Sequence, residues 1–153
     1  MSVAGVKEYL SQWGAEGKVQ EFSSSSATVA EAAALLHCSE GEIAKTLSFM
    51  TEGKAVLVVM AGDSRISNPK FKEQFHTKAV MLKSEELVEM TGHPAGGVCP
   101  FAVRSGVPVY LDKSLRRFQK VYPAAGSASS AVGLTLEELE KYSKFSAWVD
   151  IAK

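Results

Sequence analysis

The sequence predicts a single α+β domain in which a mixed, largely antiparallel β-sheet is surrounded by helices. Its 153 residues suffice for one domain that buries about 70% of its unfolded surface. Several short predicted strands follow one another without intervening helices, which argues against a doubly wound parallel sheet. Residues 55–60 are apolar throughout, as in a strand buried on both faces. With no internal repeat or boundary, residues 1–153 are expected to fold as one unit.

Helical periodicity and capping signals predict the helices. Val3, Val6, Leu10 and Trp13 share one helical face, and Gly14 ends that helix. Three capping boxes mark further helix starts: Thr28 with Glu31, Ser39 with Glu42, and Thr135 with Glu138.

Two more helices are predicted in the middle of the chain. Asn68 and Pro69 serve as cap and first-turn proline of a helix that runs to about His76. Ser84 opens another helix, which Gly92 closes.

Strands are expected where apolar and β-branched runs are bounded by turn residues. They are residues 19–22, 45–51, 54–61, 79–82, 107–111, 119–122, 131–134 and 145–151. Glu52 and Gly53 are expected to form the turn between the second and third of these, and Asp112 caps a short turn through Arg117.

Charge and composition narrow the classes of function. Seventeen basic and seventeen acidic residues balance, which argues against broad, charge-driven binding of nucleic acid. The two cysteines suggest reduced thiols. The longest apolar run, residues 55–61, is too short to cross a membrane, and no apolar signal core follows the start. We therefore expect a cytoplasmic protein without a membrane partner.

The most informative segment is residues 92–101, Gly-His-Pro-Ala-Gly-Gly-Val-Cys-Pro-Phe. Adjacent glycines permit unusual backbone angles and close approach to a ligand. Successive N–H groups in such a turn can bind an anion or a developing oxyanion. Pro94 and Pro100 restrict the loop. Taken alone, the segment favours a sharp turn between a helix and a strand.

Several sequence blocks, in order, resemble the YbaK/EbsC family of aminoacyl-tRNA deacylases. They are Ile43-Ala44-Lys45-Thr46-Leu47, Gly62-Asp63-Ser64-Arg65, Thr91-Gly92, the run from Gly96 to Phe101, Tyr110-Leu111-Asp112-Lys113-Ser114-Leu115, and Ala125-Gly126-Ser127. The resemblance covers residues 19–148 and extends to the editing insertion of bacterial prolyl-tRNA synthetases. It implies a nearly closed mixed sheet, or pseudo-barrel, and hydrolysis of the ester that joins a wrong amino acid to tRNA.

The resemblance also implies the catalytic residues. Lys45 matches the lysine most tied to activity, although by itself it reads as a surface charge at a strand edge. Gly96 and Gly97, with the N–H of Val98, suit the oxyanion or carbonyl. The resemblance further implies that the ribose hydroxyl beside the ester helps to activate the water, and no cofactor is expected. His76, His93 and Cys99 lack the spacing of zinc ligands, so no metal is expected either.

Substrate contacts are expected from residues in four regions of the chain. They are Phe22, Ser24, Thr28, Asp63, Val98, Cys99, Pro100, Gly126 and Ser127. Asp63 also fits a turn-stabilising role. Residues 22–26, Phe-Ser-Ser-Ser-Ser, depart from the family pattern, which leaves alanine, cysteine, serine and threonine open as the amino acid removed.

Two competing interpretations remain. Cys99 could be a nucleophile with His93 or His76 as its base, although most cysteines in apolar surroundings are small core residues. The chain could instead be a non-catalytic module that binds a tRNA acceptor end or a synthetase. The expected partners are therefore the tRNA acceptor end and prolyl-tRNA synthetase, which would supply the identity of the RNA.

Overall fold

The computed structural model describes residues 2–153 and contains a six-stranded mixed sheet with a separate two-stranded sheet. The strands are β1 Val19–Glu21, β2 Ile43–Thr51, β3 Lys54–Ala61, β4 Val109–Asp112, β5 Lys120–Pro123, β6 Ser130–Val132, β7 Leu134–Thr135 and β8 Ala147–Val149. The α-helices are α1 Val3–Ser11, α2 Val29–Leu36, α3 Asn68–Phe75, α4 Ser84–Thr91 and α5 Leu136–Ser143. Short 3₁₀ turns are η1 Glu16–Lys18, η2 Glu40–Glu42 and η3 Lys113–Arg117.

The large sheet has the order β7-β5-β2-β3-β4-β8, and β1 pairs with β6. Its longest pairing is the antiparallel β2–β3 hairpin, in register from Ala44 opposite Ala61 to Thr51 opposite Lys54. Shorter parallel pairs join β2 to β5, β3 to β4 and β4 to β8. The predicted α+β class with a mixed sheet is confirmed.

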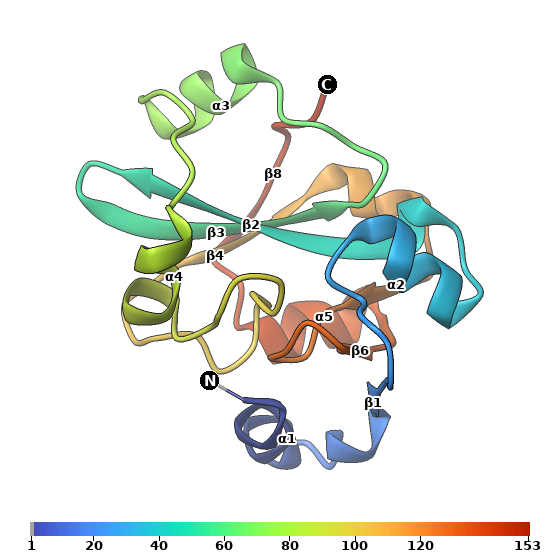
Figure 1. Cartoon of the computed structure of the whole chain (residues 1–153). Helices are drawn as coiled ribbons and strands as arrows, with labels where there is room; N and C mark the ends of the chain where they lie inside the picture. Colours follow the sequence, from blue (N-terminus) through green and yellow to red (C-terminus); the bar gives the residue numbers. More distant parts are fainter. Residues whose placement is uncertain (1) are drawn as a thin grey trace.

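The hairpin is the centre of the fold because β3 is buried on both faces, as its apolar run predicts. Alternate side chains reach two separate clusters. Val58 and Met60 pack with Phe71 of α3, whereas Leu57 and Val59 pack in the cluster that contains residues of α1 and α5. Figure 1 shows α3 on one side of the hairpin and α1, α4 and α5 on the other.

Most helix signals are confirmed, and two capping predictions need correction. The Thr28 and Thr135 boxes cap α2 and α5 as expected. The Ser39 box begins only the 3₁₀ turn η2. Ser67, not Asn68, caps α3, because the Ser67 hydroxyl accepts the N–H of Lys70 at 3.3 Å.

Two strand predictions are also corrected. Residues 79–82 form only an isolated bridge, through Met81 and Phe49, before the chain turns into α4. Residues 131–134 are divided between β6 and β7, because the chain leaves the small sheet there and joins the large one. Both cysteines are free thiols. No helix within residues 2–153 has the length and apolar character needed to cross a membrane.

Candidate active site

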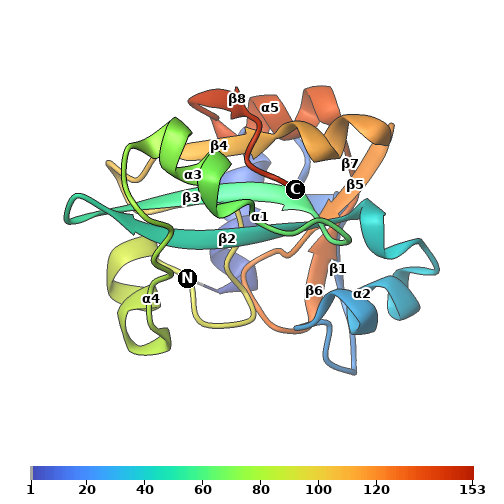
Figure 2. The same ribbon diagram turned by 90° about the horizontal axis from the view of Figure 1, so that it is seen from above.

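A cavity of about 420 Å³, which we call the main cavity, lies between β2, α2, α4 and the 95–98 loop. Figure 2 shows α2 and α4 towards opposite ends of the β2–β3 hairpin. The main cavity is lined by Ser26, Ala27, Thr28, Val29, Ala32, Ile43, Ala44, Lys45, Thr46, Leu47, Ser48, Met81, Leu82, Ser84, Leu87, Ala95, Gly96, Val98, Tyr122, Ala124, Ser130 and Ala131. Among these described residues, Lys45 alone carries a charge.

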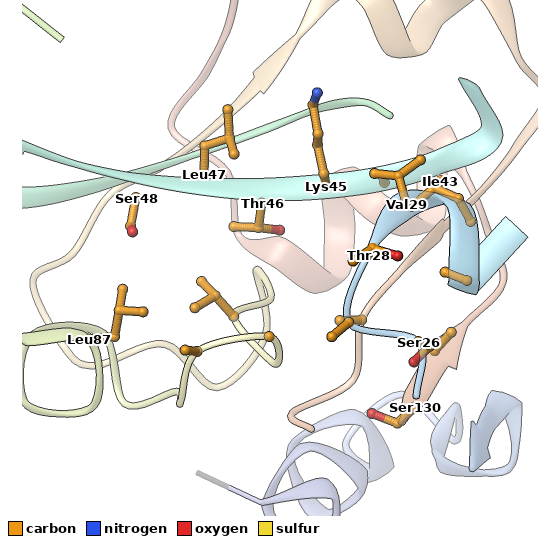
Figure 3. A pocket seen from close by; sticks show the side chains of 18 of the residues that line it. Ser26, Thr28, Val29, Ile43, Lys45, Thr46, Leu47, Ser48, Leu87 and Ser130 are labelled. Atoms are coloured by element: carbon orange, nitrogen blue, oxygen red, sulfur yellow. The ribbon is translucent and has the colours of Figure 1, made fainter. Parts of the chain in front are cut away.

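Strand alternation decides which side chains of β2 enter the main cavity. In Figure 3, Thr46 and Ser48 extend from the side of β2 that faces Leu87, and Lys45 and Leu47 extend from the opposite side. The packing agrees, because Leu47 joins the cluster built around Phe71 of α3. Lys45 therefore borders the main cavity while its side chain leaves by the other face of the sheet.

The Lys45 ammonium is held by backbone carbonyls rather than by the glycine loop. Its Nζ donates to the carbonyl oxygen of Gly62 at 3.3 Å and to that of Ser64. Burial lowers the pKa of Lys45 from its ordinary value, partly offset by the nearby Asp63 carboxylate. Alternation along β2 therefore points the Lys45 side chain away from the Gly-Gly turn, although both were matched to catalytic residues.

A second hollow of about 640 Å³ adjoins the Lys45 ammonium through Ser64, and we call it the charged hollow. It is lined by Asp63, Ser64, Arg65, Lys70, Asp112, Lys113, Ser114, Arg117, Asp150, Ala152 and Lys153. Arg117 pairs with Asp63, and Lys70 pairs with Asp150 at 3.2 Å. Arg65, Lys113 and Lys153 form no ion pair within residues 2–153, which leaves them able to meet an anion.

The glycine loop is a tight turn whose backbone is partly committed. Gly96 has φ +82°, and the N–H of Gly97 donates to the carbonyl of Pro94 at 3.0 Å. The Gly97 N–H is thus engaged within the turn, and its expected role towards an oxyanion stays a prediction. No hydrogen bond within residues 2–153 uses the N–H of Gly96 or Val98, so these two donors are the candidates for the oxyanion.

The two predicted glycine loops do lie against each other. A Cβ placed on Gly97 would come within 2.8 Å of the Ser127 Cα. Gly126 has φ +99° and is closed in by Ser2 and Val6 of the N-terminal helix region. Ser127 reaches the main cavity only through its hydrogen bond to Ser130, at 2.9 Å between the two hydroxyl oxygens.

The structure brings some of the predicted contact residues to the main cavity and not others. Thr28, Lys45, Gly96 and Val98 line it, whereas Phe22, Ser24, Asp63, Gly97, Cys99, Pro100, Gly126 and Ser127 do not. Asp63 forms the ion pair with Arg117 and borders the charged hollow. The hydroxyl of Thr28, though at the cavity, caps α2.

Cys99 and His93 do meet, but both are fully buried. The Cys99 Sγ lies 3.6 Å from Nε2 of His93, and that nitrogen lies 2.7 Å from the carbonyl of Phe101. Burial raises the pKa of the Cys99 thiol to about 12 and lowers that of His93. A thiol this hard to ionise, outside the main cavity, packs in the core and fits no nucleophilic role.

Alkylation is expected to separate the two cysteines. Only the thiolate reacts, and burial raises the pKa of Cys38 as well, so iodoacetamide at about pH 9 should label the partly exposed Cys38 slowly and spare the buried Cys99. Mass spectrometry of tryptic peptides measures this directly, with denatured protein as the control in which both react. Deacylation lost in proportion to labelling of Cys99 would revive the thiol mechanism.

Sequence reasoning missed Ser48, Leu87 and Ser130 as lining residues and did not assign Thr46 a role. Thr46 and Ser48 carried a usable signal, since they are hydroxyl residues two apart, separated by Leu47 and followed by Phe49 and Met50. Leu87 and Ser130 are indistinguishable from ordinary core and turn residues without the fold.

Comparison with known proteins settles the family. The model of the aminoacyl-tRNA editing domain matches residues 23–142. The chain belongs to the aminoacyl-tRNA editing domain family. The editing domain is 47% identical over 154 residues to YwhH, an uncharacterized protein of Bacillus subtilis, with 100% of this chain and 98% of YwhH covered.

Two further likenesses connect this editing domain to prolyl-tRNA synthetases. It is 30% identical over 90 residues to the proline–tRNA ligase of B. subtilis, which covers 58% of this chain and 16% of the ligase. A crystal structure of a protein proposed as a trans-editing enzyme for prolyl-tRNA synthetase superposes with a TM-score of 0.88. The two sequences are 28% identical, and the superposition covers 99% of this chain and 96% of the other chain. The resemblance to the family and to the synthetase insertion is confirmed.

Proposed function

We propose that this editing domain is a free-standing deacylase that hydrolyses the ester of mischarged tRNA, with tRNA-Pro carrying alanine, cysteine, serine or threonine as the expected substrate. The observation that carries the proposal is the main cavity. Its volume of about 420 Å³ suits a small aminoacyl group with part of the terminal ribose, and its lining is neutral apart from Lys45. The likeness to a proposed trans-editing enzyme supports the same assignment.

The chemistry is assigned to backbone and substrate rather than to a side-chain nucleophile. The described lining contains no histidine, cysteine, aspartate or glutamate. Water attacks the ester carbonyl, the vicinal ribose hydroxyl assists the proton transfer, and the carbon–oxygen bond to the ribose breaks. The N–H groups of Gly96 and Val98 stabilise the oxyanion, a contribution that in other enzymes is worth about 10²–10³ in rate per donor. The amino acid and the free ribose hydroxyl are released.

Lys45 is assigned to a backbone phosphate of the RNA rather than to the ester. Its ammonium has three donors, of which two are used by the carbonyls of Gly62 and Ser64. Ser64, which accepts one of these bonds, lines the charged hollow together with Arg65 and Lys113, which add positive charge there. A compact ammonium suits a phosphate as a point-charge partner.

The test is deacylation of tRNA-Pro charged with alanine, cysteine, serine, threonine or proline. We expect hydrolysis of a mischarged species and sparing of the cognate one. With balanced charge the chain has few phosphate contacts, so we expect prolyl-tRNA synthetase to raise the rate by supplying the RNA. Binding of the charged RNAs without hydrolysis of any would favour the non-catalytic module.

Lys45→Ala is expected to raise the KM of that reaction about tenfold with little change in kcat, because one phosphate contact is lost. The slope of log KM against log salt concentration should fall by about one. Lys54→Ala is the matched control, since Lys54 is exposed at the start of β3 and outside both hollows. A fall in kcat at unchanged KM would instead place the ammonium at the ester.

A further inference from the structure

Two hydroxyl groups on the wall of the main cavity make no hydrogen bond within the described chain. Thr46 and Ser48 extend from the same face of β2, towards Leu87 (Figure 3). Residues two apart on a strand lie about 6.5–7 Å apart, so both can contact one small ligand group. The Thr46 Oγ1 is buried without a partner, and Ser48 is only 5% exposed.

Of the other hydroxyls of the lining, that of Tyr122 lies on β5, and the rest are already engaged or open to solvent. That of Ser26 donates to the carbonyl of Ala128, that of Thr28 bonds with Glu31, that of Ser130 bonds with Ser127, and Ser84 is exposed. Thr46 and Ser48 are therefore the polar side chains of β2 that the fold leaves available to a ligand.

An unpartnered buried hydroxyl is unfavourable, and a ligand that supplies a partner relieves that cost. Thr46 as a residue is half-buried although its Oγ1 is buried, so another part of it is exposed. Rotation by about 120° about the Cα–Cβ bond exchanges methyl and hydroxyl and can turn the oxygen towards the cavity. A ligand hydroxyl can both donate and accept, so it can serve Thr46 and Ser48 together.

The position of Gly96 orients the substrate. A Cβ on Gly96 would meet Ala27 at 3.3 Å and Ala128 at 3.2 Å, which places this glycine beside the segment that leads into α2. Ser48 lies farther along β2 and faces Leu87 of α4. When an ester carbonyl is bound at Gly96, one of its two substituents can extend along β2, past Thr46 to Ser48, and the subsite proposed below assigns that direction to the amino-acid side chain.

We propose that Thr46 and Ser48 form the side-chain subsite, and that they select a hydroxylated amino acid, serine or threonine, over alanine. This rests on the proposed deacylase function. An apolar pocket rejects an added hydroxyl only weakly, whereas a site built to bond a hydroxyl strongly rejects the analogue that lacks it. In the alanyl ester the two hydroxyls would stay unpaired.

The experiment measures kcat/KM for one tRNA-Pro charged in turn with serine, threonine and alanine, using wild type, Thr46→Val and Ser48→Ala. We expect wild type to prefer the seryl or threonyl ester by about tenfold or more. Each variant should reduce that preference several-fold while keeping most activity on the alanyl ester. Thr51→Val is the matched control, because it makes the same change on β2 outside the main cavity.

The outcomes separate this inference from the function on which it rests. Equal or faster hydrolysis of the alanyl ester by wild type overturns the subsite and leaves the deacylase standing. If Thr46→Val and Ser48→Ala lose activity in equal proportion on all three esters while their melting temperatures are unchanged, the subsite is also overturned. Hydrolysis of none of the three by wild type overturns the subsite, and failure with the cysteinyl ester as well overturns the deacylase.

Discussion

Gly97→Ala is expected to lower the deacylation rate about 100-fold, because a displacement of about 1 Å in a catalytic loop can cost that much. The added Cβ would lie 2.8 Å from both the Cα and the N of Ser127 and 2.9 Å from the carbonyl carbon of Gly126. All three are backbone atoms, so no side chain can rotate to make room. The loop must move, and it carries the N–H groups of Gly96 and Val98 with it. Single-turnover kinetics on the mischarged RNA measures the chemical step.

Two further variants make this result interpretable. Gly17→Ala is the matched control, since its Cβ would meet nothing within 4 Å and its φ is not positive. Gly96→Ala should also slow the reaction, because Gly96 has φ +82°. Circular dichroism and the melting temperature confirm that each variant is folded. A folded Gly97→Ala enzyme within about twofold of Gly17→Ala would remove the loop from the catalytic machinery.

Local sequence signals predicted the hairpin and most helix starts because short-range physics determines them. Glu52 and Gly53 have φ values of +50° and +79°, as a tight hairpin turn requires. The capping hydroxyls of Thr28 and Thr135 each bond a backbone N–H three residues away. At residues 79–82 the local signal predicted a strand, but strand formation depends on pairing with a distant segment, and only the bridge between Met81 and Phe49 forms.

The orientation of the site residues shows where sequence reasoning stops. Alternation along β2 requires that Lys45 and Leu47 share one face and Thr46 and Ser48 the other. Which face bears the main cavity depends on whether α3 or the 95–98 loop packs there, and no local pattern specifies that. The same holds for Gly97. The pair of glycines predicted a turn, but it did not predict that the carbonyl of Pro94 would accept the N–H of Gly97.

The resemblance to known deacylases supplied the family, and the fold corrects how its residues work together. The Lys45 side chain and the glycine loop lie on opposite faces of β2. Under the proposed function, the lysine would hold the RNA from one face and the loop would act on the ester from the other, so that binding and chemistry are separated. The kinetic consequences differ accordingly, in KM for Lys45 and in kcat for Gly97.

Asp112→Ala is expected to cost at least about 3 kcal/mol of unfolding free energy, because hydrogen bonds to a charged group contribute about 1.5–3 kcal/mol each. Asp112 is fully buried, and its carboxylate accepts the N–H of Ser114 at 2.9 Å and that of Ile151 at 2.8 Å. It thereby ties the end of β4 to η3 and to the C-terminal segment. Removing it leaves two backbone donors without their acceptor. At about 2–4 °C per kcal/mol for a chain of this size, the melting temperature should fall by about 6–12 °C.

Asp150→Ala is the matched control for this effect. Asp150 is exposed and pairs with Lys70 at 3.2 Å, an arrangement worth about 0–1 kcal/mol at a solvated surface. The melting temperature of Asp112→Asn should lie between those of Asp112→Ala and Asp150→Ala, because the amide keeps one oxygen acceptor for one of the two donors. If Asp112→Ala melted no lower than Asp150→Ala, the carboxylate would not be the tie between β4 and the C-terminal segment. The gradation across the three variants therefore distinguishes loss of the two hydrogen bonds from loss of surface charge.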